Sequence, residues 1–304
     1  MIRPDLEAWV TRSLGSRPLE RLFAVSHLSA VVGVRLADGR EIVVKARSGL
    51  DRATTCVAAQ AALHADGFPC PKPLTVVQEL GGLAVHAEEY VSGGHQLVGP
   101  GWEVADAFAG LLADLISRSR RLGLGRPEPP PMWLAWDHDG PDVWPALQEQ
   151  PPNPEAIASA AWLTDMITRL RLRLRETSLD EVVGHGDWET QNMVWRNGRQ
   201  VHVVHDWDSL TARPEAALAG AAAATFASRD QPCLAPLESS ERFLETYQLR
   251  AGRRFADEEL EIAWAAGLWL AAHNARMELL YDKPPLILTT LQEESARRLL
   301  RANA

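Results

Sequence analysis

Alternating apolar and polar positions dominate the first ninety residues of the chain. Apolar side chains recur at every second position, or in short runs, over residues 22–25, 31–36, 41–46, 74–78 and 83–91. Residues 37–40, Ala-Asp-Gly-Arg, form a turn signal between the second and third of these segments. Period-two patterns bounded by turn residues indicate antiparallel strands, so we expect a sheet of about five strands, close to the usual size.

Helical spacing replaces this alternation in most of the remaining chain. Apolar residues recur three and four positions apart in the segments 102–122, 154–175, 214–228, 239–249, 257–280 and 288–301, and also in 3–14 and 53–66. Such periodicity predicts amphipathic or buried helices. The pattern therefore predicts an α+β fold with a strand-rich small lobe at residues 1–91 and a mainly helical lobe at residues 92–304.

The composition of the chain disfavours some classes of binding partner and indicates a cellular compartment. The 304 residues are 46% hydrophobic and carry a net charge of −9, which disfavours nucleic acids and anionic membranes as partners. The three cysteines lack C-x-x-C spacing, so neither a disulfide framework nor a zinc site is indicated. Without a signal peptide or an apolar run long enough for a membrane span, we expect a cytoplasmic protein.

Two polar motifs flank a predicted β-hairpin late in the chain. His185-Gly186-Asp187 is followed five residues after the aspartate by Asn192, and Asp206 lies in the second motif, His-Asp-Trp-Asp. Residues 193–195 and 201–204 read as strands joined by an Asn-Gly turn, a strong hairpin signal. We expect this hairpin to bring Asp187, Asn192 and Asp206 near one another.

This arrangement suits phosphoryl transfer, in which one carboxylate accepts the proton of the attacking hydroxyl and other oxygen ligands hold magnesium on the nucleotide. The pattern H-G-D-x-x-x-x-N, followed by hydrophobic-x-D-W-[DE], resembles the aminoglycoside phosphotransferase family. The resemblance implies a bilobal, protein-kinase-like fold that uses ATP or GTP with Mg²⁺. It also implies that Asp187 is the catalytic base and that Asn192 and Asp206 are the metal ligands.

The resemblance extends to the nucleotide side of the expected site. Lys45 ends a strand similar to the V-A-I-K strand whose lysine contacts nucleotide phosphates, although a lysine there also suits a solvated strand edge. The loop between the first two strands lacks glycine but offers Ser26 and Ser29 as phosphate donors, or is an ordinary hairpin turn. Glu89 and Val91 lie in a hinge-like segment expected to contact the adenine, and the glycines after it also suit a simple turn.

One departure from the family concerns the partner of Lys45. The family places a glutamate on the following helix, but this helix has no acid between Asp51 and Asp66. Two alternatives stay open: Gln60 accepts a hydrogen bond from Lys45, or Asp51 reaches it.

The expected acceptor region combines tryptophans with acids. The long segment 126–154 contains Asp137 and Asp139, and the helix at 257–280 ends near Glu278 and Asp282. Carboxylates beside aromatic faces favour a cationic acceptor. Alternatively, the tryptophans pin a long loop, its acids are solvated, and Glu278 is a satisfied polar group in the core.

We therefore expect an ATP-dependent phosphotransferase acting on a hydroxyl group of a small molecule, a cationic, aminoglycoside-like antibiotic being the leading case, with antibiotic resistance as its outcome. One alternative is a sugar or amino-alcohol kinase of the same fold, and another is a catalytically degenerate, kinase-fold binding protein. A metal-hydrolase cluster of His185, Asp187, His202, His205 and Asp206 is weaker, since it gives Asn192 no role. Monomer and homodimer both stay open.

Overall fold

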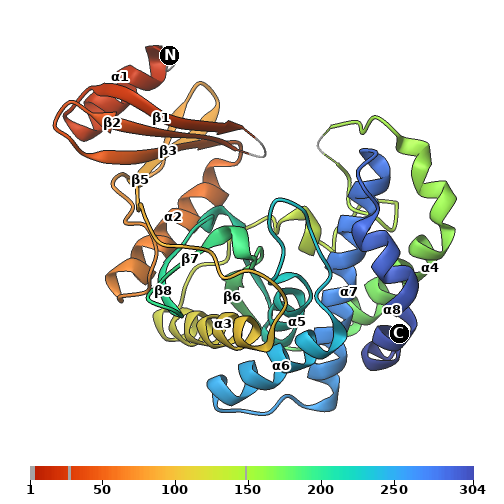
Figure 1. Ribbon diagram of the computed structural model, residues 1–304. Helices are drawn as coiled ribbons and strands as arrows, with labels where there is room; N and C mark the ends of the chain where they lie inside the picture. The colour runs from red at the N-terminus through yellow and green to blue at the C-terminus, as the bar shows by residue number, and fades with distance from the viewer. Residues whose placement is uncertain (1–3, 27–28, 148) are drawn as a thin grey trace. The chain divides into compact units, whose positions relative to one another are not determined.

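The computed structural model describes residues 4–26, 29–147 and 149–304, without the side chains of Pro4 and Ser26. The chain forms two compact units (Figure 1). The first comprises Met1–His95, Leu122–Pro129 and Val194–Asp208, and the second comprises Gln96–Arg121, Pro130–Met193 and Ser209–Ala304. The lobe boundary expected after residue 91 stays a prediction.

The first unit contains an antiparallel sheet of five strands in the order β1-β2-β3-β5-β4. The strands are β1 Pro18–Ser26, β2 Ala30–Leu36, β3 Glu41–Arg47, β4 Gln78–Leu80 and β5 Leu83–Glu89. The strand expected at 74–78 begins only at Gln78. The backbone N–H groups of Leu74 and Thr75 both donate to the carbonyl of Ala87, so this segment approaches β5 without forming a regular ladder.

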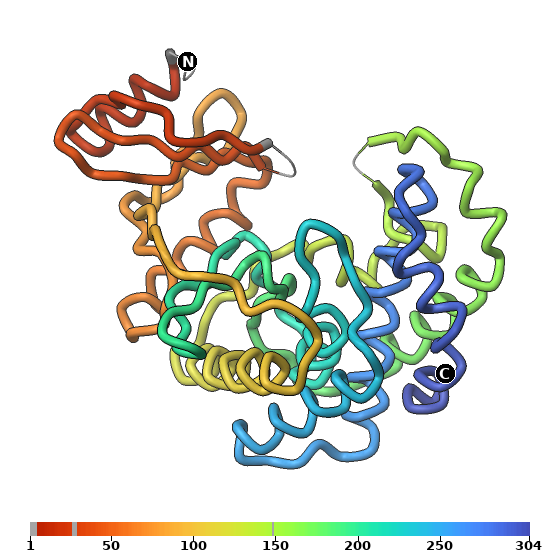
Figure 2. Tube along the Cα trace, viewed as in Figure 1, coloured from red at the N-terminus to blue at the C-terminus, as the bar shows by residue number. Residues whose placement is uncertain are grey.

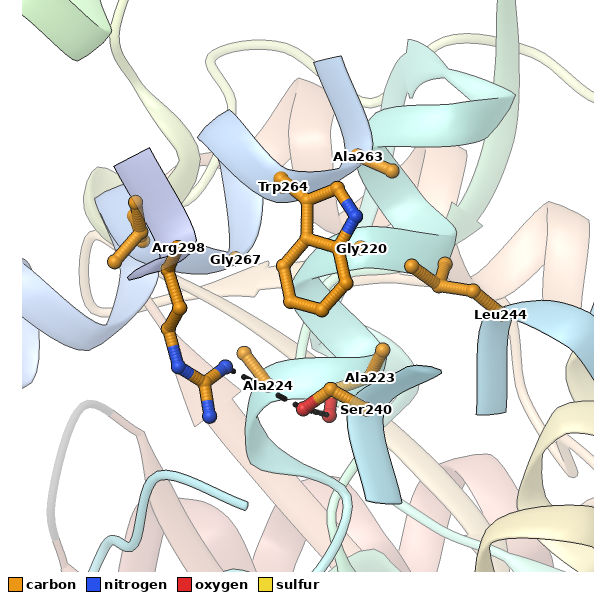
Figure 3. Close-up of a pocket in the computed structure, with 10 residues that line it drawn as sticks. Gly220, Ala223, Ala224, Ser240, Leu244, Ala263, Trp264, Gly267 and Arg298 are labelled. Atoms are coloured by element: carbon orange, nitrogen blue, oxygen red, sulfur yellow. Dashed lines mark hydrogen bonds between the residues drawn. The ribbon is translucent and has the colours of Figure 1, made fainter. Parts of the chain in front are cut away.

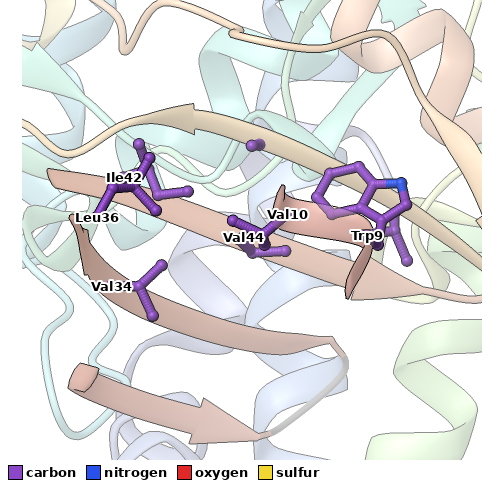
Figure 4. Packing of buried hydrophobic residues seen from close by; sticks show 8 residues of the cluster. Trp9, Val10, Val34, Leu36, Ile42 and Val44 are labelled. Atoms are coloured by element: carbon purple, nitrogen blue, oxygen red, sulfur yellow. The ribbon is translucent and has the colours of Figure 1, made fainter. Parts of the chain in front are cut away.

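Helix α1, Pro4–Leu14, packs its apolar face against this sheet. Trp9 and Val10 are buried in one cluster with side chains of three strands (Figure 4). The other buried members are Val34, Leu36, Ile42, Val44, Val85 and Ala87. These strand residues alternate along β2, β3 and β5, as expected for a sheet with one face on a core.

The first unit also contains helix α2, Leu50–Ala65. A hairpin of two paired strands, β7 Met193–Arg196 and β8 Gln200–Val204, belongs to this unit from Val194 onward. Asn197 and Gly198 have φ values of 44° and 82°. Asn and Gly tolerate positive φ, and three turn residues, 197–199, join the paired strands β7 and β8. The hairpin expected from the Asn-Gly signal is therefore confirmed.

The second unit is mainly helical and contains one short antiparallel pair of strands, β6 and β9. Its main elements are α3 Trp102–Leu122, α4 Ala161–Glu176, β6 Glu181–His185, β9 Leu210–Pro214, α5 Glu215–Thr225, α6 Leu237–Ala251, α7 Asp257–Leu280 and α8 Leu286–Ala302. Single-turn or short 3₁₀ helices are η1 Met132–Leu134, η2 Pro154–Ala160, η3 Thr190–Asn192 and η4 Trp207–Ser209, which begins in the first unit. The C-terminal residue lies beside α4, where Arg169 donates to the carbonyl of Ala304 (Figure 2).

Helices α5 and α7 cross at unusually short range. A Cβ on Gly220 would lie 1.8 Å from the carbonyl oxygen of Ala263, so only glycine fits there. A small pocket beside the crossing is lined by Trp264, Ser240 and the buried Arg298, whose guanidinium points toward Ser240 (Figure 3). The alanine-rich helix α5 is buried along its whole length and packs closely against α7 at Gly220. Among the described residues, no helix combines the length and apolar character needed to span a bilayer.

Candidate active site

The segment that carries Asp187 follows directly from the end of β6. Gly186 donates its N–H to the carbonyl of Ser209 at 2.8 Å, and its own carbonyl accepts from the indole N–H of Trp133 at 2.8 Å. A Cβ at position 186 would lie 2.9 Å from both Leu134 and the Ser209 carbonyl oxygen. The glycine therefore allows the backbone to pass through this crowded point immediately before Asp187.

The His185 ring stabilises the same turn from the inside. Its Nδ1 accepts the backbone N–H of Asp187 at 3.2 Å, which places the ring proton of the neutral form on Nε2. The ring is buried and lies edge-on to Trp188, whose indole N–H donates to the carbonyl of Phe108 on α3. His185 thus anchors the backbone amide of Asp187 itself.

Asn192 lies at the end of the short helix η3 and contacts Asp187. Its Nδ2 donates to Oδ2 of Asp187 at 2.7 Å and to the Asp187 backbone carbonyl at 2.8 Å. With the NH₂ group turned toward Asp187, the amide oxygen of Asn192 points away from it. This half of the expected constellation is brought together, and the amide oxygen is a hard donor of the kind that Mg²⁺ accepts.

A second acid, Glu189, lies beside Asp187 and was missed at the sequence level. It is buried and accepts a hydrogen bond from Gln191 at 3.0 Å. Burial, and then the charge of Asp187, raise the pKa of Glu189 well above its ordinary value. No periodic signal marks this residue, because its burial depends on the packing of the loop around it.

In the first unit, Lys45 has an acidic partner that neither sequence alternative named. Its Nζ lies 3.0 Å from Oε1 of Glu88 on β5, and both side chains are buried. Gln60 of α2 donates to the other carboxylate oxygen of Glu88 at 2.9 Å, whereas Asp51 is exposed. Burial by itself lowers the pKa of Lys45, but the charge of Glu88, followed by those of Asp208 and Asp206, gives a net increase.

Asp206 follows β8 in a left-handed backbone conformation, with φ of 59°. Two residues later, Asp208 is held by Arg47 at 3.1 Å through its carboxylate, and its carbonyl accepts from Arg52 at 2.9 Å. Burial raises the pKa of Asp208, but the charges of Lys45 and Arg47 outweigh it and the net pKa is lowered. Arg47, Arg52 and Asp208 were not identified from the sequence.

Asp206 belongs to the first unit and Asp187 to the second, so the distance between them stays a prediction. A carboxylate at Asp206 and an amide oxygen at Asn192 have the oxygen chemistry that Mg²⁺ prefers. No group of three or more His, Cys, Asp or Glu side chains in the described part of the chain is arranged to hold a metal ion.

The other expected nucleotide contacts are only partly described. The side chain of Ser26 lies outside the described residues, as do His27 and Leu28, and Ser29 is partly buried. Glu89 ends β5 with an exposed side chain, and its N–H donates to the carbonyl of Lys72. Val91 is partly exposed. The nucleotide roles of these residues stay predictions.

The expected acceptor residues have different environments. Asp137 forms a two-point ion pair with the buried Arg213, with contacts of 2.6 and 2.8 Å. Both carboxylate oxygens of Glu278 accept backbone N–H groups at the start of α8. Asp139 and Asp282 are exposed. Glu278 therefore caps α8, as the core alternative expected, and a role for it in substrate binding stays a prediction.

Two arginines of α4 bind other parts of the second unit. Arg171 donates to the carbonyls of Trp136 and His138 and so fastens the long loop to α4. Arg173 pairs with Glu261 of α7 at 2.7 Å. Arg276 of α7 adds a bond to the carbonyl of Pro145 at 3.0 Å. The loop is thus pinned from several sides by arginines.

Comparison with known proteins shows which family the chain resembles. A family model described as the phosphotransferase enzyme family, APH, matches residues 24–217. No curated protein matches the chain.

Solved structures with the same fold have low sequence identity to this chain. Amicoumacin kinase hAmiN, in complex with AMP-PNP, Ca²⁺ and Ami, has a TM-score of 0.63 at 11% identity and covers 98% of this chain and 92% of its own. A microcompartment-associated aminopropanol kinase has a TM-score of 0.63 at 15% identity, over 97% and 96%. Spectinomycin phosphotransferase APH(9)-Ia, in complex with ADP and spectinomycin, has a TM-score of 0.56 at 12% identity, over 98% and 92%. The α+β, protein-kinase-like fold is confirmed.

Proposed function

Because the chain belongs to the APH family of phosphotransferase enzymes, we propose that it transfers the γ-phosphoryl group of ATP to a hydroxyl group of a small molecule. The observation that carries this proposal is the pairing of Asp187 with Asn192 at 2.7 Å on a buried, tightly held turn. An aspartate oriented in this way is suited to accept the proton of an acceptor hydroxyl.

We assign roles to the remaining residues on the same basis. Asn192, through its amide oxygen, and Asp206 would hold Mg²⁺, which when bound neutralises charge on the nucleotide phosphates. Lys45 would contact those phosphates, since its pairing with Glu88 keeps it charged. Ser26, Ser29, Glu89 and Val91 would complete the nucleotide contacts.

The acceptor is proposed as a cationic, hydroxylated small molecule, and an antibiotic is the first candidate because two structural neighbours are named for antibiotics. Among the four acids expected to bind it, Asp139 and Asp282 are exposed, whereas the charge of the exposed Asp137 is neutralised by Arg213. An amino alcohol is a second candidate, because another neighbour is named an aminopropanol kinase. The three cysteines are free, which supports a reducing compartment such as the cytoplasm.

A phosphate-transfer screen tests the function directly. Purified protein with MgATP or MgGTP is offered a panel of aminoglycosides, other antibiotics, amino alcohols and sugars, and phosphorylated products are detected by mass spectrometry. Asp187→Asn is the matched control, because it keeps the size of the side chain and removes the base. We expect product with at least one hydroxylated amine and a loss of about 10²–10⁴ in kcat for Asp187→Asn. Unchanged turnover in that variant would refute the assignment of the base.

A further inference from the structure

The partner of Lys45 lies on a strand rather than on a helix. Strands β3 and β5 are antiparallel neighbours in which Lys45 is opposite His86 and Val43 is opposite Glu88. Because side chains alternate between the faces of a sheet, Lys45 and Glu88 project from the same face and meet diagonally. The backbone register of one sheet therefore brings the two side chains together, and Nζ of Lys45 lies 3.0 Å from Oε1 of Glu88.

The helix contributes an amide where the family has a carboxylate. Gln60 of α2 donates to Glu88 at 2.9 Å and to the carbonyl of Pro71 at 2.9 Å. The three side chains that contact one another here, Lys45, Glu88 and Gln60, are all buried. An amide cannot neutralise an ammonium group, so Glu88, the ion-pair partner in direct contact, supplies the largest part of the compensating charge that a buried lysine needs, ahead of Asp208 and Asp206.

We propose that Glu88 replaces the missing helix glutamate as the positioning residue of Lys45, and that Gln60 only orients Glu88. This inference rests on the proposed function, in which Lys45 contacts the nucleotide. In protein kinases the position of the helix controls whether the lysine-glutamate pair forms. Here both members of the pair lie on hydrogen-bonded strands, so the pair forms whatever the position of α2, and Lys45 is held ready without a helix switch.

The proposal ranks four variants by their effect on catalysis. Glu88→Gln keeps the shape and removes the charge, and we expect kcat/KM for MgATP to fall about 10–100-fold, the size of a lost charged hydrogen bond. Glu88→Asp keeps the charge and should retain more activity than Glu88→Gln. Gln60→Met removes only the amide and should lower kcat/KM less than Glu88→Gln does. Glu79→Gln, on the exposed part of β4, is the control and should leave kcat/KM unchanged.

A double-mutant cycle separates positioning from a purely structural role. If Glu88 acts through Lys45, then adding Glu88→Gln to Lys45→Met should change kcat/KM less than about threefold, because the interaction is already absent. Full additivity of the two losses would overturn the proposal. A larger loss for Gln60→Met than for Glu88→Gln would also overturn it, because it would place control on the helix.

Stability and nucleotide binding keep the pair testable if no acceptor is found. Lys45→Met leaves Glu88 buried without its cation, so the single variant should unfold at a lower temperature than the Lys45→Met/Glu88→Gln double variant. A double variant that is no more stable than Lys45→Met refutes the pair. A wild-type protein that binds no MgATP by calorimetry, yet shows the expected order of stabilities, refutes the proposed function and leaves the pair intact.

Discussion

Gly186 is fixed at both of its backbone polar groups, by Ser209 and by the indole of Trp133. Because Asp187 is the next residue, the direction of its side chain depends on these two hydrogen bonds. Trp133 comes from the long loop that sequence reasoning assigned to substrate recognition. The loop therefore helps to position the proposed base, whatever its part in binding the acceptor.

Replacing Trp133 with phenylalanine should lower kcat with little change in KM for MgATP. Phenylalanine keeps an aromatic side chain but loses the pyrrole part of the indole with the N–H that holds the Gly186 carbonyl, so we expect a decrease of about 3–10-fold, equivalent to one hydrogen bond of about 1 kcal/mol. Steady-state kinetics with a fixed acceptor measures this. Trp9→Phe is the matched control, since it removes an indole hydrogen bond of 2.9 Å to Gln78 in the other unit. An equal fall in kcat for both variants would show that general destabilisation is responsible.

The two proposed metal ligands should differ in their effect on nucleotide binding. Asp206→Ala removes a charged oxygen ligand and Asn192→Ala a neutral one, so the affinity for MgATP should fall more in the aspartate variant. Asn192→Ala should also lower kcat, because Asp187 loses the Nδ2 contact at 2.7 Å. Calorimetry in the presence and absence of Mg²⁺ measures the first effect. Equal MgATP affinity in Asp206→Ala and the wild type would contradict its metal role.

At the scale of elements, local patterns predicted most of what was found. The antiparallel strands, the Asn-Gly hairpin and the long helices follow from short-range periodicity and turn chemistry. The partner of Lys45 could not be found in this way, because β5 follows β3 in the sheet only after α2 and β4 intervene in the chain. Strand order and register are long-range properties. The same reason hides the pairing of Asp137 with Arg213 and the docking of the long loop on Arg171.

The crossing of α5 and α7 gives a prediction about elements. Gly220→Ala should destabilise the protein by about 1–3 kcal/mol or more, because the new methyl group would force the helices apart at the Ala263 carbonyl. Gly110→Ala on α3 is the control: its Cβ would come no closer than 3.7 Å to the side chain of Arg250. That change should stabilise by up to about 1 kcal/mol, the ordinary gain for alanine in a helix. Urea unfolding measures both, and similar midpoints would show that α5 and α7 can separate without loss.

At the scale of the whole molecule, the chain is interleaved between its units. Segment 122–129 follows the first segment of the second unit in sequence and segment 194–208 follows the second, yet both belong to the first unit. Arg52 of α2 binds both of these later segments to the first unit, since it donates to the carbonyls of Pro127, Pro129 and Asp208. Three carbonyls bound to one buried guanidinium leave no periodic trace in the sequence, so such returns of the chain appear only in the folded structure.

The acid stability of the molecule should depend on a histidine buried in the longest helix. His273 of α7 is buried, and burial, followed by the charge of Arg276, lowers its pKa to about 3. The unfolded chain binds a proton there below about pH 6.5, whereas the folded protein does not. The free energy of unfolding should therefore fall as the pH drops from about 6.5 towards 3, by up to about 1.4 kcal/mol per pH unit.

Replacing His273 with leucine removes this dependence without removing much volume. Relative to the wild type, the variant should gain about 2 kcal/mol of stability between pH 6.5 and 5, and nothing between pH 7 and 8, where both states leave the histidine neutral. Urea unfolding at each pH measures the difference. Met277→Leu lies on the same helix and changes no titrating group, so it should shift the free energy of unfolding by the same amount at every pH. Parallel curves for His273→Leu and the wild type below pH 6.5 would mean that His273 takes up its proton in the folded protein.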